Sequence, residues 1–338
     1  MAVNNKTIIK KRILMIFMIF LILAITAFFL MNGYINSVLN KMIKEPDINK
    51  SDADIANEVT QQNQIANVVN IVVFGADNDG NKSDEVRSDA IKIISIDLSN
   101  KEIKITSLER DLVVWIPGDY QQYGHLNWAF WVGDAALAVK TINYNFDMDI
   151  TQYVSISFDT IEKVVDLIDG VDIALTNAEV KALNLKSESS GIYTLNGKQA
   201  LAYSRIRKID DDYHRMARQQ NVIQAIVDKT VKMSKIELFN FISDFLPYVT
   251  TNLTNSDIKN YALTLMSYDL DIKTLQIPSG GYQDTCNCSK LGGYLVTSYQ
   301  EMSQEMHDFI YGLNFYSPSQ NLLTNEKNIY EKYGECNK

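Results

Sequence analysis

The N-terminal part of the chain contains a long apolar stretch. Residues 13–31 are nineteen consecutive residues without a charge, enough for a helix to cross a bilayer. A cleaved signal peptide would have a shorter apolar core that ends in small residues, whereas this stretch runs out through Met31, Asn32, Gly33 and Tyr34. Because positive charge clusters before the stretch, the N-terminus is expected to be cytoplasmic. The pattern predicts a tail at residues 1–12 and a single-pass anchor at residues 13–34.

The remaining chain is then expected to be extracytoplasmic, and its polarity divides it into three parts. Residues 35–66 are polar and end in a run rich in Gln and Asn, which is typical of a stalk. Residues 67–313 carry the regular apolar periodicity of a folded domain. Residues 314–338 are polar, and we expect a flexible tail.

Three short runs near the start of the domain read as β-strands. Residues 68–74 form a β-branched apolar run, and residues 90–97 and 102–108 alternate around a tight turn. If the three strands form an antiparallel meander, the end of the first, the start of the second and the end of the third lie at one sheet edge. That edge gathers Asp77, Arg87, Asp89, Arg110 and Asp111.

The rest of the domain mixes helical and strand patterns. Residues 126–143 predict a helix interrupted at Gly133, whose aromatic residues Trp128, Phe130 and Trp131 are expected in the core rather than in a cleft. Strands at 153–158 and 171–175 flank a helix that Asp159 and Glu162 would cap. Residues 235–313 are mainly helical, with one strand at 272–277. We predict an α/β fold with a mixed, largely antiparallel central sheet covered by helices on both faces.

Arginine is concentrated in one window. The chain has seven arginines, and four of them, Arg205, Arg207, Arg215 and Arg218, lie within residues 201–220. Arginine binds carboxylate or phosphate oxygens two at a time, which lysine cannot do. The first two arginines would point the same way on an extended segment. Arg215, Arg218 and Gln219 would share one face of a helix that Asp212 caps, near its anion-binding N-terminus. The window predicts an oxyanion site, with a solvated, salt-bridged helix start as the alternative.

Composition narrows the chemistry. The net charge is −9 although residues 1–12 are basic, so binding to nucleic acid by bulk charge is excluded. Three cysteines, Cys286, Cys288 and Cys336, make neither a disulfide framework nor a four-ligand zinc site, and both a local bridge and free thiols remain open. The three histidines are scattered. The composition therefore still allows a site in which oxygen ligands bind a hard cation.

These clusters coincide with the motifs of a known family. The chain resembles the LytR-CpsA-Psr family of bacterial envelope transferases over roughly residues 68–313. The matching motifs are Gly75-Ala76-Asp77, Arg87-Ser88-Asp89, Arg110-Asp111, Leu126-Asn127, Leu195-Asn196-Gly197 with Ala200-Leu201-Ala202-Tyr203, and Arg205-x-Arg207 followed by Asp210, Asp212, Arg215 and Arg218-Gln219-Gln220. Two residues depart from the family pattern: Glu109 replaces a usual proline, and His125 replaces a usual lysine.

The resemblance implies a membrane enzyme that moves an anionic glycopolymer, of the teichoic acid or capsular polysaccharide class, from a polyprenyl-pyrophosphate carrier to a peptidoglycan sugar hydroxyl. It also implies that Asp77 and Asp89 hold Mg²⁺, or alternatively Mn²⁺, and that Asp111, Arg110 and Arg87 are catalytic, with Asp111 as the base. The residues implied to grip the pyrophosphate are Arg87, Arg110, Arg205, Arg207, Arg215, Arg218 and Gln219. A polyprenyl pyrophosphatase and a non-catalytic regulator that binds polyprenyl phosphate are the alternative functions.

A shared Mg²⁺ sets a geometric expectation. The carboxyl groups of Asp77 and Asp89 should face each other within about 6 Å. The alternative is that Asp89 pairs with Arg87 or Arg110, which would turn the two carboxylates apart.

Overall fold

The computed structural model describes residues 31–57, 59, 67–77, 86–158, 160–186, 189–206, 209, 212–230, 232–265, 272–280, 285–312 and 316–334. Almost all of the predicted anchor at residues 13–34 lies outside these ranges, as does Arg207. In the described ranges, no helix combines the length and the apolar character that crossing a bilayer requires. The side chains of Asp77 and Arg215 also lie outside the description.

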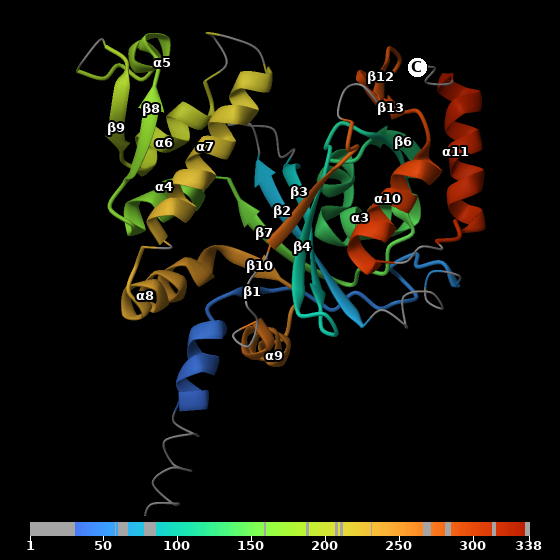
Figure 1. Ribbon diagram of the computed structural model, residues 1–338, viewed down its shortest axis with the longest axis horizontal. Coiled ribbons are helices and arrows are strands. Elements are labelled where there is room, and N and C mark those ends of the chain that lie inside the picture. Colours follow the sequence, from blue (N-terminus) through green and yellow to red (C-terminus); the bar gives the residue numbers. More distant parts are fainter. Residues whose placement is uncertain are drawn as a thin grey trace, which may run out of the picture.

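A mixed sheet forms the centre of the molecule (Figure 1). In the described part of the chain it has seven strands in the order β1-β10-β7-β2-β3-β4-β11. These strands are β1 (Ile43–Lys44), β10 (Val249–Thr251), β7 (Gln152–Ser157), β2 (Val68–Asp77), β3 (Arg87–Asp97), β4 (Glu102–Leu108) and β11 (Ile272–Ile277). Three pairings are antiparallel and three are parallel. The sheet is therefore mixed, as predicted, but it is evenly divided rather than largely antiparallel.

The predicted meander is confirmed. Strand β3 pairs antiparallel with both β2 and β4. The motif residues therefore lie at the end of β2, at the start of β3 and just after the end of β4. Alternate residues such as Val72, Phe74 and Ile93 are fully buried in the main core, which explains why these runs adopt the two-residue period of a strand. The register between β2 and β3 shifts at Gly75 and Ala76, so this edge of the sheet contains a β-bulge.

One face of the sheet is covered by α3 (Trp128–Phe146), α10 (Tyr299–Tyr311) and α11 (Gln320–Tyr333), as Figure 1 shows. Helix α3 breaks at Gly133 and Asp134, as predicted for Gly133, and a Cβ at residue 133 would lie 2.5 Å from the Leu137 side chain. Helix α11 corrects the prediction of a flexible tail for residues 316–334. Leu322 and Ile329 are fully buried in the main core, and this amphipathic spacing outweighs the polar composition.

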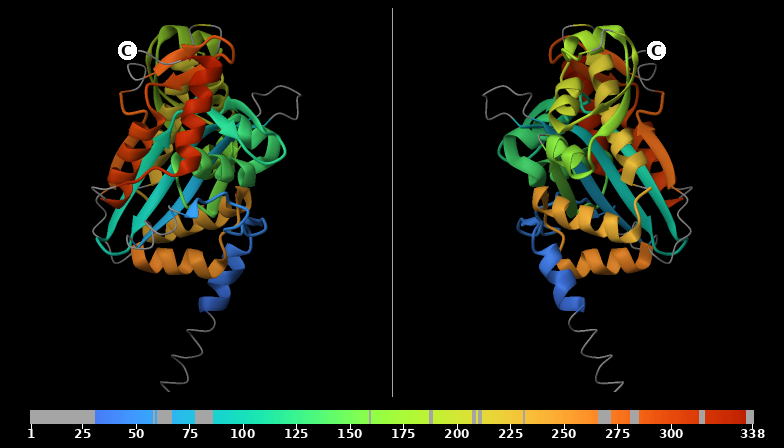
Figure 2. Two further views of the ribbon diagram at one scale, coloured as in Figure 1. Left: turned by 90° about the vertical axis from the view of Figure 1, so that its right-hand side faces the viewer. Right: turned by 90° about the vertical axis from the view of Figure 1, so that its left-hand side faces the viewer.

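The other face of the sheet is covered near its base by α9 (Asn255–Leu265), which packs its Ile258 against Ile71 and Ile96. Residues 31–39 form a helix beside it, drawn in blue at the base of Figure 2. The predicted stalk is wrong for residues 35–57, because β1 pairs with β10 and Ala53 is fully buried, its carbonyl accepting a hydrogen bond from Asn143. The folded domain therefore starts before residue 66.

A second, smaller core belongs to the residues between 160 and 230, which we call the arginine subdomain. Its elements are α4 (Thr160–Leu167), β8 (Val171–Leu175), α5 (Asn177–Ala182), β9 (Gly191–Leu195), α6 (Gly197–Ser204) and α7 (Asp212–Thr230). Strand β8 occurs where predicted, but it pairs with β9 in a separate hairpin and does not extend the central sheet. The proposed cap Asp159 lies outside the described residues.

Helix α8 (Lys235–Phe245) and the short helix η1 (Leu246–Tyr248) lead from this subdomain back to the sheet. Two further hairpins, β5–β6 (Val113–Ile116, Gln122–His125) and β12–β13 (Thr285–Cys288, Gly293–Val296), lie beside α3 and α11 (Figure 1). The sequence left both a disulfide bridge and free thiols open. In the structure Cys286 is disulfide-bonded and Cys288 is a buried free thiol.

Candidate functional site

The motif residues of the meander meet at one end of the sheet, here called the sheet rim (Asp77, Arg87, Asp89, Arg110 and Asp111). Asp77 is the last residue of β2 and pairs directly with Arg87, the first residue of β3. Asp89 is the extra residue of the bulge, since Ser88 pairs with Ala76 and Ala90 pairs with Gly75. A bulge locally breaks the side-chain alternation of the strand. The backbone thus brings both predicted metal ligands to one place, and the separation of their carboxylates stays a prediction.

Arg110 is the charged centre of the rim. Its guanidinium is almost fully buried, with Nη1 2.7 Å from Asp89 Oδ1 and Nε 3.4 Å from Asp111 Oδ2. Asp89 therefore makes the ion pair that the sequence offered as the alternative to a metal. The backbone of Arg110 is held by the Leu126-Asn127 motif, because the Asn127 amide donates to the Arg110 carbonyl at 3.0 Å. Arg87 approaches from β3, with its guanidinium carbon 5.4 Å from the ring centre of Trp131.

The aromatic residues of α3 divide between core and site. Phe130 is buried in the main core, as predicted. Trp131 is instead 37% exposed beneath Arg87, and Trp128 stacks on His125 with 4.4 Å between ring centres. The core prediction is thus wrong for Trp131. It failed because only one side of the first turn of α3 faces the core: Ala129 and Phe130 are buried, whereas Trp131 lies beneath Arg87.

Asp111 and His125 form a polar pair beside Arg110. His125 Nδ1 lies 3.4 Å from Asp111 Oδ1, and its Nε2 lies 2.9 Å from the carbonyl of Leu291. Both ring nitrogens of His125 therefore face oxygen acceptors. Burial raises the pKa of Asp111, but the hydrogen bond with His125 and the charge of Arg110 outweigh it, so the pKa lies below its ordinary value of 3.8. Asp111 is therefore an ionised carboxylate at neutral pH.

Glu109 behaves in the opposite way. It is largely buried, and this burial, followed by the neighbouring charge of Asp111, raises the pKa of Glu109 above its ordinary value of 4.5. Its backbone amide donates to the Ile277 carbonyl at 2.9 Å, which a proline at this position could not do. The departure from the family pattern at residue 109 thus ties the rim to β11.

The arginine window is built on α6 and α7. Asn196 and Gln199 form a complete capping box at the start of α6, and Arg205 is the C-cap at its end, with φ −103° and ψ 5°. Arg205 is thus not on an extended segment, contrary to the sequence-based expectation. The expectation that Arg205 and Arg207 point the same way as alternate residues of a strand therefore does not apply, because Arg205 lies at a helix end.

Arg218 has a different position from the one predicted. It is 2% exposed, its Nε donates to Glu179 Oε1 at 2.9 Å, and its Nη1 donates to the Ile206 carbonyl at 2.8 Å. Two of its donors therefore serve the interior of the arginine subdomain and hold the backbone next to Arg205. Gln219 is also buried, with 8% exposure. These contacts fix the position of Arg218 within the subdomain, and its implied role in gripping a pyrophosphate stays a prediction.

The donor set of the rim suits a hard cation. Among the described residues no three His, Cys, Asp or Glu side chains gather to hold a metal, and the side chain of Asp77 lies outside that description. Mg²⁺ is usually held by one or two carboxylates, with waters and phosphate oxygens completing its shell. Within the described residues, Ser88 Oγ and Asn127 Oδ1 are buried without a hydrogen-bond partner, so oxygen capacity remains beside Asp89 and Arg110.

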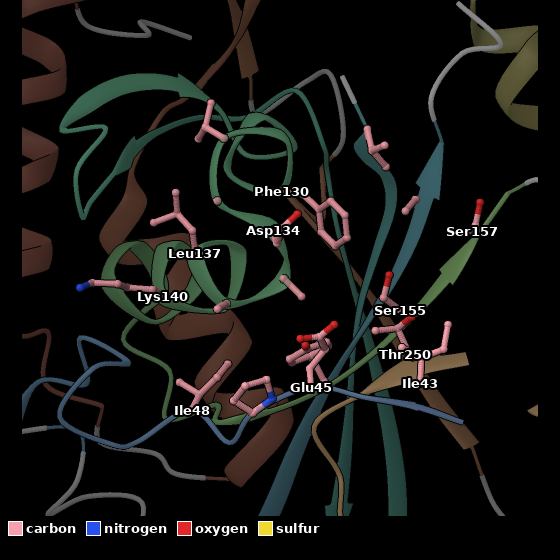
Figure 3. Close-up of a pocket in the computed structure, with 18 of the residues that line it drawn as sticks. Ile43, Glu45, Ile48, Phe130, Asp134, Leu137, Lys140, Ser155, Ser157 and Thr250 are labelled. Atoms are coloured by element: carbon pink, nitrogen blue, oxygen red, sulfur yellow. The ribbon is translucent and has the colours of Figure 1, made fainter. Parts of the chain in front are cut away.

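A cavity of about 1200 Å³ lies between α3 and the sheet (Figure 3). Ala76 and Ser157, which pair across β2 and β7, line it next to the rim. Phe130 and Asp134 of α3 line the cavity opposite β7, and Ile43 and Tyr248 line it near the base of the domain. The volume exceeds the roughly 300–1,000 Å³ that is usual for small-molecule sites. A long ligand with an anionic end fits this arrangement.

The chain is thus an α/β protein with a mixed central sheet and an acidic, arginine-containing sheet rim. The chain belongs to the LytR_cpsA_psr family, whose model matches residues 30–308. It is 30% identical over 250 residues to the regulatory protein MsrR of Staphylococcus aureus (strain COL), covering 72% of this chain and 74% of MsrR.

Two further comparisons concern TagT. The chain is 29% identical over 259 residues to the polyisoprenyl-teichoic acid–peptidoglycan teichoic acid transferase TagT of Bacillus subtilis (strain 168), covering 70% of this chain and 76% of TagT. A solved structure of TagT bound to LI-WTA superimposes with a TM-score of 0.52 at 25% identity, covering 73% of this chain and 92% of that one. The fold expected from the sequence is thus that of the family.

Sequence reasoning missed several residues that build the site. Glu179, the partner of Arg218, was recognisable only as the fourth residue of a capping box that begins at Thr176. The Leu291 carbonyl and Gly293 come from a hairpin far along the chain, and the pair Gly292-Gly293 was the available signal of a close approach. A Cβ at residue 293 would lie 2.5 Å from the Asp111 carbonyl oxygen, so only glycine fits there.

Proposed function

We propose that the protein transfers an anionic glycopolymer, of the teichoic acid or capsular polysaccharide class, from a polyprenyl-pyrophosphate carrier to a sugar hydroxyl of peptidoglycan. The observation that carries this proposal is the charged cluster of Asp89, Arg110 and Asp111, together with a cavity lined by Ala76 and Val86, the residues just before Asp77 and Arg87 of the rim. An apolar carrier chain would occupy the cavity and leave its pyrophosphate at the rim. The relative TagT, named as a teichoic acid transferase, and its solved structure with LI-WTA support the same assignment.

The reaction assigns a role to each rim residue. The acceptor hydroxyl oxygen forms a bond to the phosphorus that carries the polymer, and the bond from this phosphorus to the bridging oxygen breaks. Polyprenyl monophosphate leaves, and the hydroxyl proton passes to Asp111, an ionised acceptor. Arg110 and Arg87, with Arg205, Arg207 and Arg215 of the arginine window, would neutralise the phosphate oxygens. Arg218 holds the window in place from inside.

Mg²⁺, or alternatively Mn²⁺, would be held by Asp77 and Asp89 and would neutralise charge on the pyrophosphate. The test is Asp77→Asn, which should lower transfer at fixed Mg²⁺ and recover partly as Mg²⁺ is raised. Asp54→Asn, a substitution away from the rim, is the control. An Asp77→Asn enzyme with unchanged metal dependence contradicts the assignment.

The proposed carrier also requires a membrane. We infer that residues 13–34 anchor the chain in the bacterial cell membrane, with residues 1–12 cytoplasmic and the domain extracytoplasmic. The support is the uncharged stretch of residues 13–31 and the basic residues before it. Cysteines introduced at Ser51 and at Ser289 should react with a membrane-impermeant thiol reagent in intact cells. Protection of both would contradict the orientation.

The decisive experiment supplies the full chain with a polyprenyl-pyrophosphate-linked glycan, Mg²⁺ and peptidoglycan. Phosphodiester-linked glycan on peptidoglycan supports the proposal, release of inorganic phosphate would indicate a pyrophosphatase, and binding without product would indicate a regulator. The last outcome has its own support, because the relative MsrR is named a regulatory protein. Arg205→Lys should lower transfer about 10²-fold, since fork geometry matters. Lys208→Ala, next to the same loop, should have a mild effect.

A further inference from the structure

The base of the domain exposes large apolar side chains on two neighbouring helices. On α8, Ile236 is 75% exposed, and Phe239 and Ile242 are also exposed at successive intervals of three residues. Leu263 of α9 is 67% exposed. At 3.6 residues per turn, the acidic residues Glu237 and Asp244 of α8 fall on the opposite side of the helix. Figure 2 shows both helices crossing the base of the molecule.

The helix of residues 31–39 is fastened between these two helices. Lys259 of α9 donates to Asn32 Oδ1 at 3.0 Å and to Asn36 Oδ1 at 3.1 Å. Tyr34 stacks on Phe239 of α8, with ring centres 5.9 Å apart. Lys41, just beyond the helix, donates to Ser243 Oγ of α8 at 2.7 Å. The segment that leads out of the domain is thus rigidly docked and is not a free tether.

This docking fixes the distance of α8 and α9 from the end of the apolar stretch at residues 13–31. The uncharged stretch ends at Met31, and Asn32 and Tyr34 are one and three residues further on. With a rise of about 1.5 Å per residue, both helices contact the chain within about 5 Å of the end of the stretch. The nineteen residues of the stretch extend about 28 Å as a helix, close to the hydrocarbon thickness of a bilayer.

We propose that the basal face, formed by Tyr34, Ile236, Phe239, Ile242 and Leu263, rests on the surface of the lipid bilayer. An apolar helix side next to the end of a spanning segment lies where interfacial helices bury their apolar side chains, and tyrosine is enriched at that depth. The occupant is lipid because the polypeptide itself enters the bilayer at this point. This inference rests on the proposed membrane anchor and carrier.

The contact explains how a membrane lipid reaches the rim. Ile43, one residue beyond Met42 of the docked segment, lines the base of the cavity, as do Pro247 and Tyr248, which directly follow α8. The cavity lining therefore includes residues of the two segments that adjoin the basal face. A carrier chain can pass from lipid into the protein without crossing water, and its pyrophosphate can remain at the sheet rim.

The depth of the basal face can be measured directly. A nitroxide label on Ile236→Cys, in the full chain reconstituted in phosphatidylethanolamine–phosphatidylglycerol vesicles, reports its access to oxygen and to an aqueous nickel chelate. Ile192→Cys on β9 is the matched control, because Ile192 is 77% exposed and β9 lies well away from α8 (Figure 1). Labelling without reductant leaves Cys286 in its disulfide and Cys288 buried, and the unsubstituted chain sets the background.

We expect an oxygen-to-nickel ratio several-fold higher at residue 236 than at residue 192. Equal ratios would overturn the inference, and shielding of residue 236 from both reagents would show a protein partner instead of lipid. This readout needs no catalysis, so it is independent of the proposed reaction.

A functional readout then separates this inference from the reaction itself. The variant Ile236→Glu/Ile242→Glu should raise the apparent KM for a vesicle-embedded donor about tenfold, equivalent to about 1.4 kcal/mol. Transfer from a short-chain, water-soluble donor should be unchanged, and Ile192→Glu should alter neither. Equal losses with both donors, or no loss, count against the basal face. Absence of transfer by the unsubstituted chain would contradict the proposed function and leave the label experiment to decide the inference.

Discussion

Replacing Arg218 tests whether it positions the arginine window or grips the ligand. Arg218→Met keeps much of the side-chain volume but removes the bonds to Glu179 and to the Ile206 carbonyl. Breaking a buried ion pair from one side costs about 3–5 kcal/mol, because the remaining charge loses its partner. Glu179 keeps two bonds from Thr176, at 2.9 Å from the amide and 2.8 Å from the hydroxyl. We therefore expect Arg218→Met to lower the free energy of unfolding by about 3 kcal/mol, the lower end of this range.

The loss should be confined to the arginine subdomain, because its core is separate from the main core. Native-state hydrogen exchange should show faster exchange in α7 and β8 and little change in β3. The double variant Arg218→Met/Glu179→Gln removes the stranded charge and should recover a measurable part of the stability. Transfer should fall in the single variant, because the backbone between Arg205 and Arg207 is released.

Two results would refute this reasoning. A loss of stability below about 1 kcal/mol would mean that the two bonds are not structural. A large loss of transfer with unchanged exchange in α7 would mean that Arg218 acts on the ligand directly, as the family resemblance first suggested. Arg218→Lys should resemble the methionine variant, since an ammonium cannot reproduce both contacts of the fork.

The remaining predictions concern the rim and its supports. Above pH 4.5, the ordinary pKa of glutamic acid, Glu109→Gln should increase the free energy of unfolding relative to the unsubstituted chain. The pKa of Glu109 is raised in the folded state, so the unsubstituted chain loses stability as pH rises from 4.5 through that raised pKa. Urea unfolding from pH 4 to pH 8 measures this, and parallel stability curves for the two proteins would contradict it. Gly293→Ala should lower both transfer and thermal stability, because the added Cβ would lie 2.5 Å from the Asp111 carbonyl oxygen. Gly292→Ala is the control for backbone strain alone, because a Cβ at residue 292 has no atom within 4 Å although the residue has φ +74°. His125→Gln should weaken transfer mainly through the orientation of Asp111, with a changed pH profile, and an unaltered profile would show that His125 serves packing only.

The local periodicities predicted the elements that define the rim. Strands β2, β3 and β4 follow from runs whose alternate residues face a core. Their antiparallel order predicts Asp77, Arg87 and Asp89 at one sheet edge, and the pairing of β2 with β3 confirms it. A two-residue period and a tight turn are local properties, so one sequence suffices to find them.

What the sequence could not provide depends on partners that are distant along the chain. Strand β8 pairs with β9 because its neighbours form a separate core, and nothing within residues 171–175 distinguishes this from a place in the central sheet. Arg218 looks like a ligand-binding arginine until Glu179, 39 residues away, is placed beside it. Polar composition likewise hid the two buried positions of α11, Leu322 and Ile329.

Helix α11 also determines when the protein can finish folding. Leu322 and Ile329 complete the same core as Val139 and Ile142 of α3, and Asn325 donates to Asn145 Oδ1 at 2.7 Å. Asn145 in turn bonds the backbone of Trp115 on the β5–β6 hairpin. During synthesis, α3 is made long before α11, so the part of the core that the two helices share can close only after α11 has been made.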